Sequence, residues 1–215
     1  MKLIRKTEVW RPTRWGFLLI FLLIGVLGLG LSQGLYPFLA QNCPLSQAEL
    51  IIIEGWLPDA ELVQLVAETE PGTLWVTTGG PIKFGGSLFD EKTYAEVTTE
   101  RLQKLGVSSE AILTASAPDV AADRTYASAL AVRDKLEEQG LFGRPANLYT
   151  LGAHSRRSFL LYRLAFDSEG SLGVVALENE ELDLRHWCRS SLAFRQVADE
   201  AIAWLYVQCT RWKYK

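Results

Sequence analysis

The sequence predicts an α/β fold: a three-layer, Rossmann-like sandwich with a mostly parallel five-stranded sheet, preceded by one N-terminal transmembrane helix. Five short apolar runs are rich in β-branched and aromatic residues and lack polar–apolar alternation, which is typical of strands covered on both faces. Helix-length amphipathic segments separate these runs, as the crossovers between parallel strands require. One stretch near the N-terminus is apolar for long enough to cross a bilayer.

Composition and charge exclude several classes of protein. The chain has 215 residues, of which 48% are hydrophobic and 22% are charged, as in ordinary globular proteins. This composition excludes a disordered chain, a collagen-like fibre and a disulfide-dense miniprotein. The net charge is −3, and residues 1–14 carry five basic residues against one acidic residue, so the remainder carries −7. An acidic body argues against nucleic-acid binding, and we expect no nucleic-acid partner.

Residues 15–39 are predicted to form the transmembrane helix, between a basic cytoplasmic flank (1–14) and a linker (40–48). No charged residue occurs from Trp15 to Ala48, and the apolar segment exceeds the roughly 20 residues that span a bilayer. It is also longer than the apolar core of a signal peptide, about 7–15 residues, so an uncleaved anchor is favoured over a cleaved leader. Basic flanks stay cytoplasmic. We therefore expect a single-pass inner (plasma) membrane protein of a bacterium, with its main domain (49–215) periplasmic or otherwise extracytoplasmic.

Strands and helices alternate beyond residue 49. Pro58 suits the first turn of a helix, Gly106 suits a C-cap, and Ser155 suits an N-cap. The predicted strands are residues 50–54, 73–78, 111–115, 147–151 and 173–177. The predicted helices are residues 58–69, 91–105, 124–139, 155–166 and 189–208.

Candidate ligand-binding residues follow the ends of the predicted strands, where open parallel sheets bind ligands. Two of these strand ends lead to helix starts that carry arginines, and helix N-termini and arginine forks both attract phosphate or carboxylate groups. The alternative is that these arginines pair with nearby carboxylates and hold loops in place. The candidates are Gly55, Trp56, Thr78, Gly79, Gly80, Arg124, Thr125, Ser155, Arg156 and Arg157.

His154, Glu54 and Asp123 are the candidate acid–base residues. Histidine titrates near neutral pH and can act as a general acid or base, although a structural hydrogen bond at a helix start is the alternative for His154. Gly79 and Gly80 are expected to let an anion approach the backbone. With Gly85 and Gly86 they bracket residues 81–84, which form either a flap over the site or a plain surface loop.

No cofactor and no metal are expected. The chain has no Walker loop, no HExxH and no GxSxG motif, and its two histidines and three cysteines offer little for a zinc site. Cys188 and Cys209 are expected near opposite ends of one helix, too far apart for a disulfide. Whether Cys43 pairs with either stays open. The C-terminal residues 211–215 are basic and aromatic, which suits either a membrane surface or a solvated tail.

Over about residues 48–208, the order of motifs resembles the YdcF/SanA/ElyC-type bacterial proteins, a domain family of unknown function often carried behind one membrane helix. The motifs are Ile51–Trp56, Val76–Gly80, Leu105–Val107, Ile112-Leu113, Thr125, Thr150 with His154 and Arg157, and Glu200 before Trp204–Tyr206. Tyr94, Ala115, Ala127 and Ser128 stand where the family carries acidic or amide residues, as in a divergent branch.

The resemblance implies a Rossmann-like fold and a role in cell-envelope biogenesis or barrier function. Our leading hypothesis is that the extracytoplasmic domain binds a phosphorylated or carboxylated ligand, either a small molecule or a lipid-linked metabolite. Whether the domain also transforms this ligand is left open by the sequence. The alternative is a non-catalytic scaffold that binds a protein partner in the envelope, which the missing family carboxylates favour.

Overall fold

The computed structural model describes residues 9–70, 72–83, 92–167, 171–178 and 182–214. Five strands form one sheet: β1 (Leu50–Glu54), β2 (Leu74–Gly79), β3 (Ile112–Ser116), β4 (Ala146–Leu151) and β5 (Leu172–Leu177). All neighbouring strands are parallel, in the order β3-β2-β1-β4-β5, so the predicted α/β fold with a parallel five-stranded sheet is confirmed.

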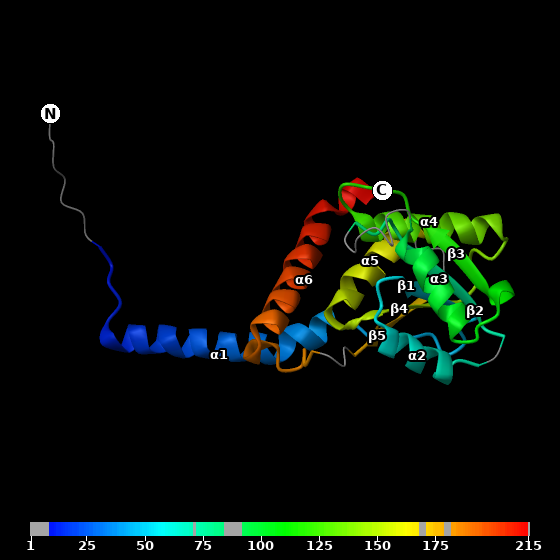
Figure 1. The fold of residues 1–215 in the computed structure, drawn as a ribbon. Helices are drawn as coiled ribbons and strands as arrows, with labels where there is room; N and C mark the ends of the chain where they lie inside the picture. The colour runs from blue at the N-terminus through cyan, green and yellow to red at the C-terminus, as the bar shows by residue number, and fades with distance from the viewer. Residues whose placement is uncertain (1–8, 71, 84–91, 168–170, 179–181, 215) are drawn as a thin grey trace, which may run out of the picture.

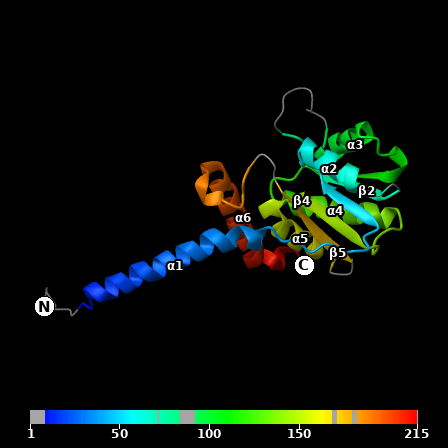
Figure 2. The ribbon, with the colours of Figure 1, turned by 90° about the horizontal axis from the view of Figure 1, so that it is seen from below.

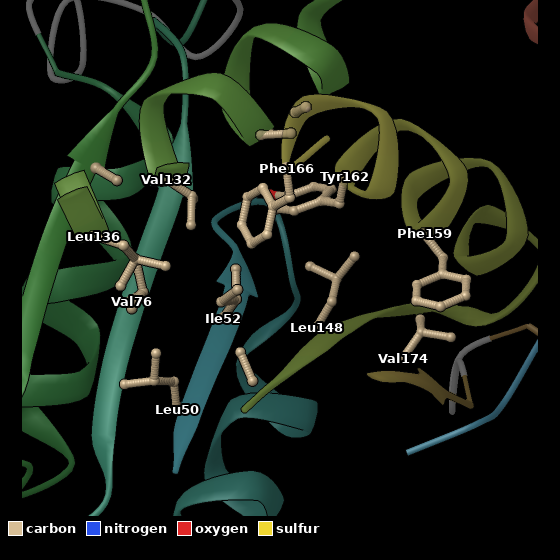
Figure 3. Close-up of a cluster of buried hydrophobic side chains, with 14 residues drawn as sticks. Leu50, Ile52, Val76, Val132, Leu136, Leu148, Phe159, Tyr162, Phe166 and Val174 are labelled. Atoms are coloured by element: carbon tan, nitrogen blue, oxygen red, sulfur yellow. The ribbon is translucent and has the colours of Figure 1, made fainter. Parts of the chain in front are cut away.

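The described part of the chain also has six α-helices, and four of them cover the two faces of the sheet (Figure 1). The helices are α1 (Arg14–Leu39), α2 (Asp59–Glu68), α3 (Tyr94–Lys104), α4 (Arg124–Glu138), α5 (Ser155–Ala165) and α6 (Ser191–Thr210). One apolar cluster joins Ile52, Leu148 and Val174 of the sheet to α4 and α5, with Tyr162 fully buried in it (Figure 3). On the opposite face, alternate strand residues such as Ile53 pack against α2 and α3. This arrangement gives the predicted three layers.

The capping residues explain where α3 begins. The sequence predicts a helix from residue 91, whereas α3 begins at Tyr94. The Thr93 hydroxyl accepts from the Glu96 backbone N–H at 3.2 Å, and the Glu96 carboxylate accepts from the Thr93 backbone N–H at 2.7 Å. This reciprocal capping box satisfies two backbone donors that would otherwise be unpaired, so the helix starts there.

Helix α1 is long and apolar enough to cross a membrane, by its length and composition (mean hydropathy 2.3 over its most apolar window). Its first part projects away from the domain (Figures 1 and 2). Its last turns belong to the globular domain, because Tyr36 and Leu39 are buried against Ala153, Trp187 and neighbouring apolar side chains. The predicted membrane segment 15–39 therefore includes one part free of the domain and one part packed on it.

The expected linker, residues 40–48, is held against the sheet. The backbones of Cys43 and Val174 exchange hydrogen bonds of 2.9 and 3.1 Å. The Asn147 side chain bonds both the N–H (2.8 Å) and the carbonyl (3.0 Å) of Leu45. These contacts fix the orientation of α1 relative to the domain. Cys43, Cys188 and Cys209 are all free and exposed.

Candidate functional site

A cleft of about 550 Å³ lies at the carboxyl ends of the strands, lined by residues that follow β1, β2, β3 and β4 and by one side of α6. From β1 the chain continues to β2 on one side, and it later returns to β4 on the other side of β1. This reversal is the switch point at which doubly wound sheets bind their ligands. The structure thus brings most of the predicted site residues to one place.

Glu54 lies at the floor of this cleft, at the end of β1, and is only 3% exposed. The Thr150 hydroxyl on β4 donates to one carboxylate oxygen, and the Ser158 hydroxyl on α5 donates to the other at 2.9 Å. The His154 ring lies 3.6 Å from the same carboxylate, measured from Nε2. Burial alone would raise the pKa of Glu54, but His154 and these hydroxyl donors lower it below its ordinary value.

His154 lies between two carboxylates. Its Nδ1 is 2.8 Å from Glu200 Oε1, a hydrogen-bond distance, whereas its Nε2 is 3.6 Å from Glu54. The same Nδ1 lies 2.9 Å from Arg157 Nη2, which can only donate, so Nδ1 faces a donor as well as an acceptor. In the protonated ring Nδ1–H donates to Glu200. Trp56 packs edge-on against the ring at 5.0 Å between centroids. Burial would lower the pKa of His154, but Glu54 and Glu200 outweigh it and raise the pKa to about 9.

Arg157 completes the network from the first turns of α5. Its Nε and Nη2 atoms hold both oxygens of Glu200, at 2.9 and 3.1 Å, in the bidentate geometry that makes such pairs strong. Its Nη1 donates to Thr125 Oγ1 at 3.4 Å. Burial would raise the pKa of Glu200, but His154 and Arg157 lower it to about 2. Glu54, Glu200, His154 and Arg157 therefore carry two negative and two positive charges that balance internally.

This balance makes the stability of the fold depend on pH. Since His154 has a folded-state pKa of about 9, above the ordinary 6.5, its stabilising contribution is complete below about pH 6.5 and is lost as the pH rises to 9. Glu200 acts in the opposite direction, and its contribution is lost as the pH falls from 4.5 to about 2.

We expect the melting temperature of the full-length protein in detergent to exceed that of His154→Gln by the largest margin near pH 6.5. The margin should narrow towards pH 9, because wild-type His154 then becomes neutral as well. Differential scanning fluorimetry of both proteins across this range measures it. A margin that stays constant from pH 6.5 to 9 would show that His154 is not charged in the folded protein.

Two of the predicted glycines have a packing role. A Cβ at Gly55 would lie 2.5 Å from the Tyr94 carbonyl oxygen, and one at Gly79 would lie 2.6 Å from Tyr94 Cβ. Gly79 also has a φ of 147°, which L side chains rarely adopt. Gly79 and Gly80 line the cleft, whereas Gly55 lies beneath α3 with its carbonyl bonded by the Thr98 hydroxyl at 2.7 Å.

Gly55→Ala is expected to lower the free energy of unfolding by about 1–3 kcal/mol, because the backbone of α3 has to move away from the added methyl group. Gly80→Ala is the matched control, since its added Cβ would find its nearest atom at an ordinary 3.4 Å. Thermal denaturation of the two variants compares them. Equal losses would contradict the assignment of Gly55 to α3 packing.

The N-terminus of α4 forms the opposite wall of the cleft, with Asp123, Arg124 and Thr125. Asp123 adopts a left-handed backbone conformation (φ 56°) and accepts a hydrogen bond from the Tyr214 hydroxyl at 2.8 Å. Burial and Asp123 raise the pKa of Tyr214 to about 12, so Tyr214 remains a donor at neutral pH. In the described parts of the chain, no carboxylate lies within ion-pair distance of Arg124. Arg124 is thus the predicted arginine that faces the cleft with its charge available.

The structure keeps Ser155 and Arg156 out of the cleft, contrary to the expectation that they bind the ligand. The Ser155 hydroxyl is buried and donates to the Leu39 carbonyl at 3.2 Å. The Arg156 guanidinium lies 4.0 Å from the centre of the Phe38 ring and donates to the Phe38 carbonyl. Both side chains hold the end of α1. Successive residues point in different directions around a helix, so only Arg157 of the pair turns towards the cleft.

Several cleft residues were not among the predicted site residues. Glu200 and Tyr206 come from α6, which follows no strand directly, so a search of strand ends does not find them. The family resemblance did single out Glu200, but only as a motif position. Lys83 and Asp119 form an ion pair of 2.6 Å at the rim of the cleft. The predicted flap includes Phe84, Gly85 and Gly86, which lie outside the described residues.

The arrangement suggests how an anionic group could be held. Arg124 and the backbone N–H groups of the first turn of α4 present positive charge and donors to the cleft. His154 also lines the cleft, with its Nε2 3.6 Å from the Glu54 carboxylate, so an anionic group there would lie beside the charged ring. With a pKa of about 9, His154 is a proton donor at neutral pH and not a base.

No protein-family model, curated protein or solved structure significantly matches this chain. The resemblance to the YdcF/SanA/ElyC-type proteins therefore stays a prediction carried by the motifs themselves.

Proposed function

We propose that this protein is anchored by α1 in the inner (plasma) membrane of a bacterium and binds an anionic ligand in the cleft of its extracytoplasmic domain. The observation that carries the proposal is the convergence at the switch point of the sheet. There an arginine without an ion-pair partner among the described residues, a helix N-terminus and His154, whose pKa is raised to about 9, line one cleft. The ligand carries a phosphate or carboxylate group, because these are the groups that such donors hold.

The basic charge of the segment before α1 supports the cellular part of the proposal. Five basic residues precede the apolar part of the chain, and basic flanks stay in the cytoplasm. The cleft domain then lies outside the cytoplasm, in keeping with the envelope role that the YdcF/SanA/ElyC resemblance implies. If the ligand is transformed as well as bound, the His154 Nε2–H is the proton donor, held in place by Glu200 through Nδ1.

Mass spectrometry of molecules released from the purified full-length protein tests this function. We expect a phosphorylated or carboxylated compound with the wild-type protein and its loss with Arg124→Ala. A compound without an acidic group, or one retained by both proteins, would refute anion binding in the cleft. A reporter enzyme fused at Lys215 tests the orientation, since activity of a cytoplasm-dependent reporter would refute the extracytoplasmic placement.

A non-catalytic scaffold is the second candidate function. It is favoured by the bidentate pairing of Arg157 with Glu200, because this pairing uses internally a cation that a ligand would otherwise attract. A scaffold would purify without a bound small molecule and would keep its envelope protein partner in His154→Ala. Affinity purification of both proteins from membranes distinguishes the two functions.

A further inference from the structure

Helix α6 lies between the free part of α1 and the sheet. It runs crosswise to α1 in both views of the ribbon (Figures 1 and 2). Two contacts fix it there: the Trp204 and Phe38 rings meet edge-on at 5.0 Å, and Trp187, just before α6, donates to the Ser32 carbonyl at 3.0 Å. The position of α6 relative to α1 is therefore set by packing and hydrogen bonding.

The two sides of α6 differ in what they contact. Val197 and Val207 are buried against the domain, and Glu200 belongs to the cleft network. On the other side of α6, the apolar side chains of Ile202 (66%) and Leu205 (54%) are exposed. Trp212, just beyond the C-terminal end of the helix, is also exposed (70%). Apolar side chains gathered on one exposed surface mark a contact with a partner or a membrane.

We propose that this exposed side of α6, with Trp212, rests on the surface of the bilayer in which α1 is inserted. The inference depends on α1 being a membrane anchor, as proposed above. From Arg14 to Ser32 the helix has a length of about 28 Å at 1.5 Å per residue, close to the roughly 30 Å of the hydrocarbon layer. The bilayer surface then falls at Ser32, the level at which Trp187 and the start of α6 meet α1.

The composition of this surface fits the headgroup region better than the hydrocarbon interior. Arg195 and Asp199 are exposed on α6 together with Ile202, and charged side chains there limit how deeply the helix can enter. Arg211 and Lys213 flank Trp212 at the C-terminal end, and tryptophan beside basic residues is typical of membrane–water interfaces. If a protein partner bound the exposed side of α6 instead, nothing would require that side to lie at the level where α1 leaves the bilayer.

Helix α6 carries Glu200, Ala203 and Tyr206 on the wall of the cleft, so the helix that contacts the bilayer also borders the binding site. With α6 on the bilayer, this cleft would suit an acidic group attached to a membrane lipid, the lipid-linked form of the proposed ligand.

The test uses the native Cys209, which is exposed on the same side of α6 as Ile202 and Leu205. Full-length protein with Cys43→Ser and Cys188→Ser is spin-labelled at Cys209 and placed in nanodiscs of phosphatidylcholine and phosphatidylglycerol. The accessibility of the label to oxygen, which concentrates in lipid, is compared with its accessibility to a water-soluble nickel chelate. The controls also carry Cys209→Ser, so that each has a single label: Glu138→Cys, the last residue of α4, is the aqueous control, and Leu23→Cys, in the middle of α1, is the lipid control. The C-terminal end of α4 lies far from α1 (Figure 1).

We expect the ratio of oxygen to nickel accessibility at Cys209 to be several-fold higher than at Glu138→Cys. A label at Cys209 that behaves as in water, while Leu23→Cys reports lipid, would overturn the placement of α6 and leave the anchor intact. A label at Cys209 shielded from both reagents would overturn it in favour of a protein partner or a second copy. An aqueous label at Leu23→Cys would overturn the anchor, and the inference with it.

Discussion

Replacement of Glu54 by glutamine is expected to lower the free energy of unfolding by about 3–5 kcal/mol, the usual cost of removing one partner from a buried ion pair. Glu54 is 3% exposed, and its negative charge lies next to the positive charge of protonated His154. A neutral amide cannot compensate the buried positive charge of His154. We therefore also expect the pKa of His154 to fall below about 9 in this variant, which NMR titration of the ring can measure.

Urea denaturation of the full-length protein in detergent measures the loss of stability. Glu100→Gln is the matched control, because it breaks an exposed ion pair with Lys92 and should cost no more than about 1 kcal/mol. In the double variant Glu54→Gln/His154→Gln both charges are gone, so its loss should be smaller than the sum of the two single losses. Additive losses would contradict direct coupling between Glu54 and His154.

Arg124→Ala is expected to weaken anion binding about 10- to 100-fold, because it removes a charge-assisted hydrogen-bond donor worth about 1.5–3 kcal/mol. Arg124 lines the cleft at the N-terminus of α4. Isothermal titration calorimetry of the full-length protein with pyrophosphate as the probe measures the change. At high salt the wild-type affinity should fall, since exposed charges are screened.

Arg156→Ala is the matched control for this prediction. Arg156 also lies in the first turn of a helix at the same edge of the sheet, but its guanidinium packs on Phe38 of α1. Its removal should leave pyrophosphate affinity unchanged and loosen the contact between α1 and the domain. Equal weakening in Arg124→Ala and Arg156→Ala would show that the anion does not bind in the cleft.

The regular elements could be predicted from the sequence because their signals are local. Parallel strands covered on both faces produce continuous apolar runs, and the five predicted runs match β1–β5 to within one residue at each end. The predicted ends of the helices were less accurate than those of the strands, because capping residues decide where a helix begins. The predicted helix 189–208 is α6, Ser191–Thr210, and it starts where the Ser190 hydroxyl accepts from the Ala193 N–H.

The site could be predicted in part. The rule that ligands bind at strand ends located Glu54, Thr78, His154 and Arg157, which all line one cleft. The rule treats every polar residue at a helix start alike, and therefore could not separate Arg157, which faces the cleft, from Arg156, which holds α1. The rule also could not identify Glu200, because this residue lies on α6, near the C-terminus, and does not follow a strand.

By itself, the sequence determined the α/β class, the alternation of strands and helices, and an N-terminal segment apolar enough to span a membrane. These properties depend on composition and periodicity within short windows, which folding does not change. The strand order, the direction of each arginine and the meeting of Glu54, His154 and Glu200 were decided only by the tertiary structure. His154 and Glu200 are 46 residues apart in the chain, and only the packing of α6 against α5 brings their side chains within 2.8 Å. The charge of Glu54, together with that contact, raises the pKa of the histidine to about 9, which no local pattern could reveal.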